Sequence, residues 1–157
     1  IVLQIVISVL SPKVAALYAK NEIKQLKQLI YNFTLLLAIV AIILVVGYTL
    51  FGLPVIRLWG EGFSQSYIYL LILMFGQFFA TIGGTTGTIL VMTNNERITG
   101  KIAISFMLIT ILLNFLLILK YGGIGACIAT ALCTAGENLT RYFIIRKYLG
   151  INILSKK

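Results

Sequence analysis

The sequence predicts an all-α integral membrane protein, and both its composition and its pattern support this fold class. Of the 157 residues, 60% are hydrophobic and 11% are charged, whereas about a quarter of the residues in an average soluble domain are charged. Predominantly apolar stretches, long enough to cross a bilayer as helices, alternate with short connections that hold most of the Lys and Arg residues. Soluble enzymes, disordered tails and disulfide-stapled secreted modules are therefore excluded as classes.

The ionisable side chains argue against catalysis. The chain has 13 Lys and Arg residues and four acidic residues, all of them Glu, and it has no His. Without His the chain lacks an imidazole base and an ordinary zinc site, and without Asp it lacks an Asp pair that could hold Mg²⁺. It also has no GxxxxGK(S/T) motif, which nucleotide-binding loops require. We expect no enzymatic activity, no cofactor and no metal. We also expect no nucleic-acid partner, because the net charge of +9 is spread over short connections.

Residues 1–11 are expected to be the last part of a helix that Ser11 and Pro12 close. This part is too short to cross a bilayer unaided, and no initiator Met precedes it, so we interpret the chain as a fragment of a larger protein. A signal peptide is the alternative for this opening, although no basic segment precedes its apolar run.

A basic segment over residues 13–30 follows, and we assign it to a cytoplasmic loop. Ile23, Leu26 and Ile30 recur in it at helical spacing, opposite several Lys residues. This pattern predicts an amphipathic helix in the lipid headgroup region. An ordinary solvated linker helix is the alternative.

Four transmembrane helices are predicted next, over residues 31–52, 66–93, 101–119 and 124–147. In the first, residues 33–51 would rise about 28 Å as a helix, close to the roughly 30 Å thickness of the hydrocarbon layer. Gly52 and Pro54 are expected to end it. The second is long enough to require a bend, which the glycine-rich stretch 83–87 would permit. The fourth must continue past Glu137, because too few uncharged residues precede that position for a complete crossing.

The basic residues predict the orientation. Apart from Arg57 and Lys120, all Lys and Arg residues lie in three segments, which are residues 13–27, 94–101 and 141–157. Cytoplasmic loops retain Lys and Arg, so we expect these segments on the cytoplasmic side, with residues 148–157 as a cytoplasmic tail. The prediction is a multi-pass protein of the cytoplasmic (inner) membrane that contacts membrane lipids and has a cytoplasmic carboxyl terminus.

Two of the predicted helices carry a polar stripe. Its members recur three or four residues apart, and they are Gln77, Thr81, Thr85 and Thr88 on the second helix and Thr130, Thr134, Glu137 and Arg141 on the fourth. Two such faces predict an internal seam or cavity that avoids lipid. The alternative is that small and hydroxylated residues only let helices pack closely, as the pairs Gly83–Gly87 and Gly125–Ala129 would.

Glu137 is the only acidic residue well inside a predicted span. An Asp at the bilayer centre costs about 2.5–3.5 kcal/mol on insertion scales, so Glu137 needs a partner, a proton or a water-filled pocket. Arg141, one helical turn away, is the obvious partner. The pair could face a polar substrate, or Glu137 could carry a coupling proton; the alternative is a structural ion pair.

The remaining polar and sulfur-containing side chains of the spans are weaker candidates. Asn114 and Asn138 are expected to form hydrogen bonds between helices. Cys127 and Cys133 are six residues apart on one helix, which turns their side chains about 240° from each other. A disulfide between these two cysteines is therefore excluded.

Five segments spread over nearly the whole chain carry a resemblance to a known family. They are SPKVAALYAKNEIKQLKQL, FGLPVIRLWGEGF, YLLILMFGQFFATIGGTTGTILVMTNNERI, LNFLLILKYGGIGACIATAL and RKYLGI. In their order and spacing the chain resembles the carboxyl-terminal portion of oligosaccharide-lipid flippases, the Wzx-type O-antigen or capsule repeat-unit translocases. These belong to the multidrug/oligosaccharidyl-lipid/polysaccharide (MATE-like) exporter superfamily.

The resemblance implies a parent with about twelve or more helices in two lobes around a cavity. This chain would be the C-terminal lobe, with four complete transmembrane helices and the end of a fifth. The implied function is to move undecaprenyl-pyrophosphate-linked oligosaccharide repeat units across the cytoplasmic membrane for O-antigen, lipopolysaccharide or capsule biosynthesis. Polysaccharide polymerase and chain-length machinery are further implied partners. The resemblance also implies that most of the first two helices of this lobe, which contribute much of the family's cavity, would lie outside this chain.

The candidate substrate or coupling residues are Glu137, Arg141, Gln77, Thr81, Arg97 and Lys101. A pyrophosphate head would enter near Arg97, Lys101 and Arg141, which lie at or near the expected cytoplasmic mouth; a purely topogenic role is the alternative for each. Two other functions stay open. One is a cation-coupled multidrug or metabolite antiporter of the same superfamily with Glu137 as coupling site, and the other is a non-transporting membrane scaffold whose polar stripes are packing seams.

Overall fold

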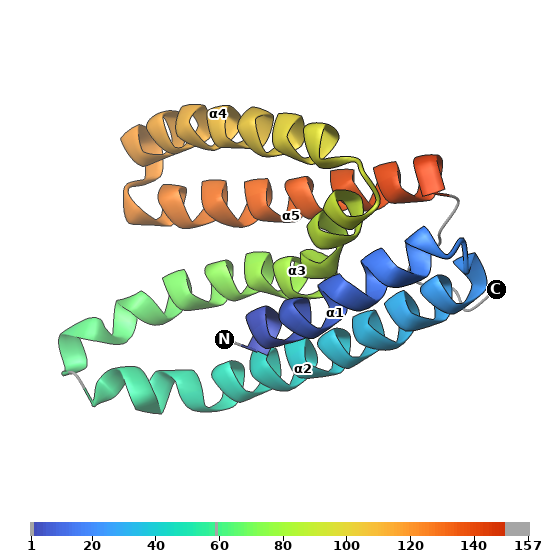
Figure 1. Ribbon diagram of the computed structural model, residues 1–157. Helices are drawn as coiled ribbons and strands as arrows, with labels where there is room; N and C mark the ends of the chain where they lie inside the picture. Colours follow the sequence, from blue (N-terminus) through green and yellow to red (C-terminus); the bar gives the residue numbers. More distant parts are fainter. Residues whose placement is uncertain (1, 59, 150–157) are drawn as a thin grey trace.

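The computed structural model describes residues 2–58 and 60–149. This part of the chain is 94% helical and contains no strand, which confirms the predicted all-α class. The helices in chain order are α1 (Val2–Ala19), α2 (Ile23–Arg57), the short 3-10 helix η1 (Glu61–Gln65), α3 (Ser66–Met92), α4 (Glu96–Tyr121) and α5 (Gly123–Leu149). In Figure 1, α3 lies between α2 and α5, α1 packs against α2 and α3, and α4 covers α5.

Within the described residues, three segments are long and apolar enough to cross a membrane, and they are Ile23–Arg57, Gly62–Met92 and Glu96–Tyr121. Among the residues of α4 only Ile102 is buried, and large apolar side chains such as Leu112 and Phe115 are exposed. Exposed apolar faces of this extent are typical of helices that contact lipid. The predicted fourth span corresponds to α5, which is less apolar and is not among the three.

Two tight turns that connect helices share one geometry. Asn21 between α1 and α2 and Asn94 between α3 and α4 have positive φ angles, 57° and 64°. In each turn the amide after the asparagine donates to a carbonyl five residues earlier, as Glu22 does to Leu17. This hydrogen bond closes a helix through a left-handed residue, a conformation that asparagine tolerates better than most side chains do. Both turns lie at the end of the bundle where α5 also ends (Figure 1).

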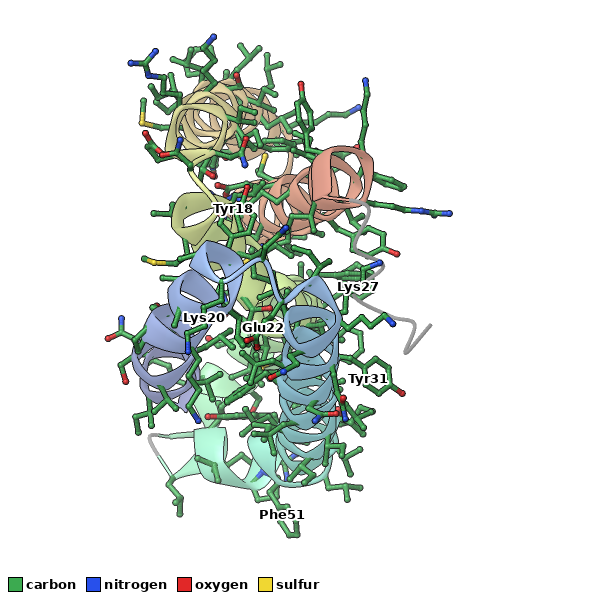
Figure 2. The ribbon with its side chains drawn as sticks, turned by 45° about the vertical axis from the view of Figure 1, so that its right-hand side comes forward. Tyr18, Lys20, Glu22, Lys27, Tyr31 and Phe51 are labelled. Carbon is green, nitrogen blue, oxygen red and sulfur yellow. The ribbon has the colours of Figure 1, made fainter. Side chains whose placement is uncertain are left out.

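Basic residues gather at this end, which we call the basic end. They are Lys20, Lys24, Lys27, Arg97, Lys101, Arg146 and Lys147. Figure 2 shows the α1–α2 turn with Lys20 and Glu22, whereas Phe51 projects away from the far part of α2. Arg57 and Lys120 lie at the opposite end, near the ends of α2 and α4. The charge asymmetry counted along the sequence is therefore an asymmetry between the two ends of the bundle.

The core of buried side chains lies at the basic end and joins four helices. Its members are Leu10, Val14, Leu26, Ile30, Ile89, Leu90 and Ile145. The apolar face predicted within residues 13–30 thus packs on protein, with Leu26 and Ile30 in the core and Ile23 against it; its position relative to lipid headgroups stays a prediction. Residues 13–19 end α1 and residues 23–30 begin α2. Burial of apolar area against α3 and α5 holds this helical hairpin in the bundle.

Two predicted helix ends are wrong, because each helix passes through the proline that was expected to end it. α1 continues through Pro12 and α2 continues through Pro54. The continuation of α1 keeps Leu10 and Val14, on either side of Pro12, in the core. Gly52 does not end α2, since it is buried inside the helix. Neighbouring helices in a membrane bundle compensate for the hydrogen bond that a proline removes.

The helices α2 and α3 run antiparallel, with η1 between them. Tyr67 fastens this pair: an added Cβ at Gly52 would lie 3.0 Å from its ring, and its hydroxyl donates to the Thr49 carbonyl at 2.8 Å. Farther along, Figure 1 shows that α3 bends in its second half, where the glycine-rich stretch 83–87 predicts a bend. Of the predicted tail, residues 148–157, Tyr148 still belongs to α5 and residues 150–157 lie outside the described part.

Candidate functional site

The helices α3 and α5 lie side by side in the same direction, and glycines of α3 set their separation. The facing pairs are Gly76 with Ala131, Gly83 with Asn138 and Gly87 with Arg141. The residue numbers rise together along both helices, which makes the pair parallel. A Cβ added to Gly83 would lie only 2.7 Å from the Cβ of Asn138. Gly83 therefore has the packing role considered as an alternative for the small residues, whereas a Cβ at Gly87 would make only an ordinary contact, 3.5 Å from Nη1 of Arg141.

The helices α4 and α5 are antiparallel and approach still more closely. A Cβ added to Gly125 would lie 2.1 Å from the Leu117 carbonyl oxygen, and one added to Gly136 would lie 2.9 Å from the Phe106 ring. Gly125 thus allows the backbones of α4 and α5 to touch. Because α5 packs tightly on two sides, α3 on one and α4 on the other, its polar stripe is held among apolar neighbours.

Glu137 and Arg141 form an ion pair along α5. Nη2 of Arg141 donates to Oε1 of Glu137 at 2.5 Å. The side chain of Arg141 is 18% exposed, and that of Glu137 is 26% exposed. The guanidinium lies beside Gly87, where an added Cβ would be 3.5 Å from Nη1. Nε of Arg141 is buried and has no hydrogen-bond partner in the part of the chain that the structure describes. The guanidinium therefore has a donor that a further acceptor would satisfy.

The ion pair lies far from the ends of its helix. α5 has 27 residues and is about 40 Å long, which places Glu137 about 20 Å from either end. Its neighbours α3 and α4 are both apolar enough to cross a membrane. An ion pair placed that far from both ends of a membrane-spanning helix would be costly, which is a reason to look for a function.

A groove between α4 and α5 opens beside Glu137. Its volume is about 250 Å³, and its polar lining consists of Thr110, Thr130, Thr134 and Glu137, with Cys133 next to them. The hydroxyl of Thr110 donates to its own helix, to the Phe106 carbonyl at 2.6 Å. A carboxylate among hydroxyl groups can accept a proton or bind a polar group of a substrate.

The other candidate residues of α3 line a different space. Gln77 and Thr81 lie with Tyr48 of α2 around a pocket of about 300 Å³ between α2 and α3. The Thr81 hydroxyl donates to the Gln77 carbonyl at 2.8 Å, and the Gln77 side chain is exposed. Gln77 and Thr81 of the α3 stripe therefore line a pocket separate from the groove that Thr130, Thr134 and Glu137 of the α5 stripe line.

The remaining candidates, Arg97 and Lys101, are exposed near the start of α4, at the basic end. The structure thus brings Glu137 and Arg141 together on α5, and it places Arg97 and Lys101 apart from them at the basic end.

The prediction that Asn114 and Asn138 bond between helices is wrong. Each side-chain amide donates at 2.9 Å to a carbonyl one turn earlier in its own helix, Asn114 to Thr110 and Asn138 to Thr134. The carbonyl of the preceding turn is the nearest acceptor for a short side chain on a helix.

Sequence analysis missed a third pocket, of about 250 Å³, lined in part by Thr34 of α2 and by Thr86 and Asn138. Thr34 was passed over because it is an isolated hydroxyl in an apolar run, and α2 shows no polar stripe. Its one signal is burial: its side chain is 2% exposed and its hydroxyl has no hydrogen-bond partner.

Cys127 and Cys133 are both free, as their spacing predicts. Within residues 2–58 and 60–149, no three His, Cys, Asp or Glu side chains are grouped so that they could hold a metal ion. Comparison with known proteins finds no matching family model, no similar curated protein and no similar solved structure. The functional argument therefore depends on the residues themselves.

Proposed function

We propose that this chain is part of a flippase that moves undecaprenyl-pyrophosphate-linked oligosaccharide repeat units across the cytoplasmic membrane. The order of its segments, with a basic turn after the first helix and glycine-rich, polar-striped helices later, supports this function. The observation that carries most weight is the Glu137–Arg141 pair, which lies midway along α5 next to a polar groove. A polar head that crosses a bilayer needs such groups on its path.

We also propose that α5 crosses the membrane as the fourth complete span. Its own sequence is not apolar enough to require this, but its packing supports it. It lies parallel to α3 from Gly76 to Gly87 and antiparallel to α4 along its length, and both of those helices are apolar enough to span. A helix held between two spans at this depth shares their environment. The basic end would then face the cytoplasm, as retention of Lys and Arg favours.

The Glu137→Gln variant tests the flippase proposal. It keeps the shape of the side chain but removes the charge that pairs with Arg141. We expect the appearance of lipid-linked repeat units at the outer leaflet to slow about tenfold or more, since a hydrogen bond between charged groups contributes about 1.5–3 kcal/mol. The rate is measured in cells that depend on this protein, by labelling of outer-leaflet glycolipid, while the amount of membrane-inserted protein stays at the wild-type level.

The matched control is Glu96→Gln, which removes an exposed carboxylate in the first turn of α4, away from the groove. This variant should transport normally. Normal transport by Glu137→Gln, with normal assembly, would contradict a role for the pair. Loss of assembled protein without loss of transport per molecule would favour a scaffold. If transport by Glu137→Gln persisted but no longer depended on an ion gradient, the cation-coupled antiporter would be favoured instead.

A further inference from the structure

The helices α2 and α5 run antiparallel on either side of α3 (Figure 1), and a groove lies between them. We call it the α2–α5 groove. Its lining includes Thr34 of α2, Phe79 and Ile82 of α3, and Leu139 and Tyr142 of α5. Within the described residues no Cα atom of α2 comes within 8 Å of one in α5. The two walls of the groove therefore stand apart, with α3 as the floor.

The surface that the groove exposes is almost entirely apolar. Its polar members use their polar atoms within their own helices, since the Thr86 hydroxyl donates to the Gly83 carbonyl and the Asn138 amide donates to the Thr134 carbonyl. The groove volume is about 250 Å³, which admits a stretch of hydrocarbon chain, because a cavity of about 150 Å³ holds a benzene molecule. Leu139 on the α5 side is exposed, so such a chain can enter from the bilayer.

Two basic residues continue the walls of this groove toward the basic end. Lys27 precedes Thr34 by seven residues on α2, and Arg146 follows Leu139 by seven residues on α5. Residues seven apart lie on one face of a helix, about 10 Å along its axis. Figure 2 shows Lys27 on the side of α2 that faces away from α1. The apolar groove therefore has a cationic side chain on each wall at its basic end.

The protein leaves the charges of Lys27 and Arg146 uncompensated. Lys27 is half-buried and Arg146 is exposed, and neither forms an ion pair with a side chain of the described residues. Next to them, Ile30 of α2 and Ile145 of α5 pack in the same core cluster, which holds the two walls at a fixed separation. A negatively charged group between the walls would meet two cations that have no other partner.

We propose that the α2–α5 groove binds an acyl chain of an anionic phospholipid of the phosphatidylglycerol class, with its phosphate held between Lys27 and Arg146. Basic pockets between transmembrane helices bind anionic headgroups in this way, and the roughly 10 Å between the cations and the groove lining leaves room for the glycerol group. The site is separate from the Glu137–Arg141 pair. It requires the basic end to lie at the headgroups, but it does not depend on the flippase function.

Photolabelling of the full chain in an uncharged detergent tests the proposal, with a phosphatidylglycerol that carries a diazirine in one acyl chain as probe. We expect saturable labelling of peptides that contain Phe79, Ile82 or Leu139. Unlabelled phosphatidylglycerol should displace the probe, whereas phosphatidylcholine with the same acyl chains, whose ammonium group the two cations repel, should not. The double variant Lys27→Gln/Arg146→Gln should weaken probe binding about tenfold or more, since each basic residue near an anionic headgroup contributes about fivefold.

The matched control is Lys20→Gln/Lys147→Gln, which removes the same charge from exposed positions at the same end. Lys20 lies in the α1–α2 turn, on the other side of α2 from Lys27 in Figure 2, and Lys147 is turned about 100° around α5 from Arg146. At about 0.15 M salt, charges more than about 8 Å apart are largely screened. The control should therefore bind the probe like the wild type.

Three results would overturn the proposal. They are competition by phosphatidylcholine as strong as that by phosphatidylglycerol, equal effects of the two double variants, and labelling that does not saturate or that falls outside the groove peptides. Each of them describes lipid that merely surrounds the protein or a general attraction to its charge. If Lys27→Gln/Arg146→Gln does not fold, the competition between the two lipids and the position of the label decide.

Discussion

Glycine residues determine how closely the helices of this bundle approach, and the neighbour opposite each glycine decides what a side chain there would cost. Gly83 faces Asn138, whereas Gly47, on α2, has no atom within 4 Å of an added Cβ. A side chain added at Gly83 would therefore overlap a neighbouring helix, whereas one added at Gly47 would meet open space. The sequence indicates only part of this difference: Gly83 stands in a stretch with Gly84 and Gly87 that favours close packing, whereas Gly47 stands between Val46 and Tyr48.

We predict that Gly83→Ala lowers the free energy of unfolding by about 1–3 kcal/mol, because the new methyl group overlaps Asn138. Gly47→Ala should leave stability unchanged or raise it by about 0.5–1 kcal/mol, since alanine is the better helix former. Thermal or denaturant unfolding of the two variants in detergent makes the comparison. Equal effects of the two changes would disprove the close contact between α3 and α5.

Among the helices, α4 and α5 differ most in what surrounds them. α4 is apolar around its circumference and has a single buried residue, Ile102, which suits contact with lipid. α5 carries the polar stripe and is covered on two sides by α3 and α4. The low hydropathy of α5 is therefore compatible with its position between two other helices, which cover part of its surface.

The α2–α3 pair gives a prediction at the same scale. Tyr67→Phe removes the hydroxyl that donates to the Thr49 carbonyl on α2, and we expect it to lower stability by about 0.5 kcal/mol, because the bond is exposed and competes with water. Tyr48→Phe, on the exposed face of α2, is the control and should have no measurable effect. Chemical denaturation in detergent measures both, and an unchanged stability of Tyr67→Phe would mean that the Tyr67 hydroxyl contributes nothing to the α2–α3 contact.

The whole molecule has two unlike ends, and this asymmetry leads to a topology prediction. The α3–α4 turn and the end of α5 lie at the basic end, whereas the α4–α5 turn at Gly122 lies at the other (Figure 1). In a background with Cys127 and Cys133 replaced by Ala, we expect Asn94→Cys and Tyr148→Cys to react with an impermeant thiol reagent from the cytoplasmic side only. Gly122→Cys should react from the outside only.

This labelling pattern distinguishes the number of spans. If α4 and α5 both cross, the reactive side changes between positions 94 and 122 and changes back between 122 and 148. Reaction of Gly122→Cys and Tyr148→Cys from the same side would show that α5 does not cross, and would remove the basis for placing Glu137 inside the bilayer. The labelling assay needs no knowledge of the substrate, so its result is independent of the transport measurements.

Part of the candidate site could be predicted from the sequence. The spacing of Glu137 and Arg141 is set by the local geometry of a helix, which places residues four apart on one face, and the structure contains the ion pair. The pairing of Gln77 with Thr81 follows from the same rule. Which neighbouring helix each stripe faces is set by packing between distant segments, and for this reason the separation into two pockets was not foreseen.

The sequence by itself determined the helical class, the apolar segments and the gathering of basic residues at one end, because hydropathy and helical periodicity act over one or two turns. Only the tertiary structure decided that α1 and α2 continue through their prolines, that α3 and α5 run parallel in close contact, and that Thr34 lies buried without a partner. These features depend on which surfaces meet. Burial against a neighbouring helix outweighs the local preference of a proline or an isolated hydroxyl, and no local pattern records which neighbour that will be.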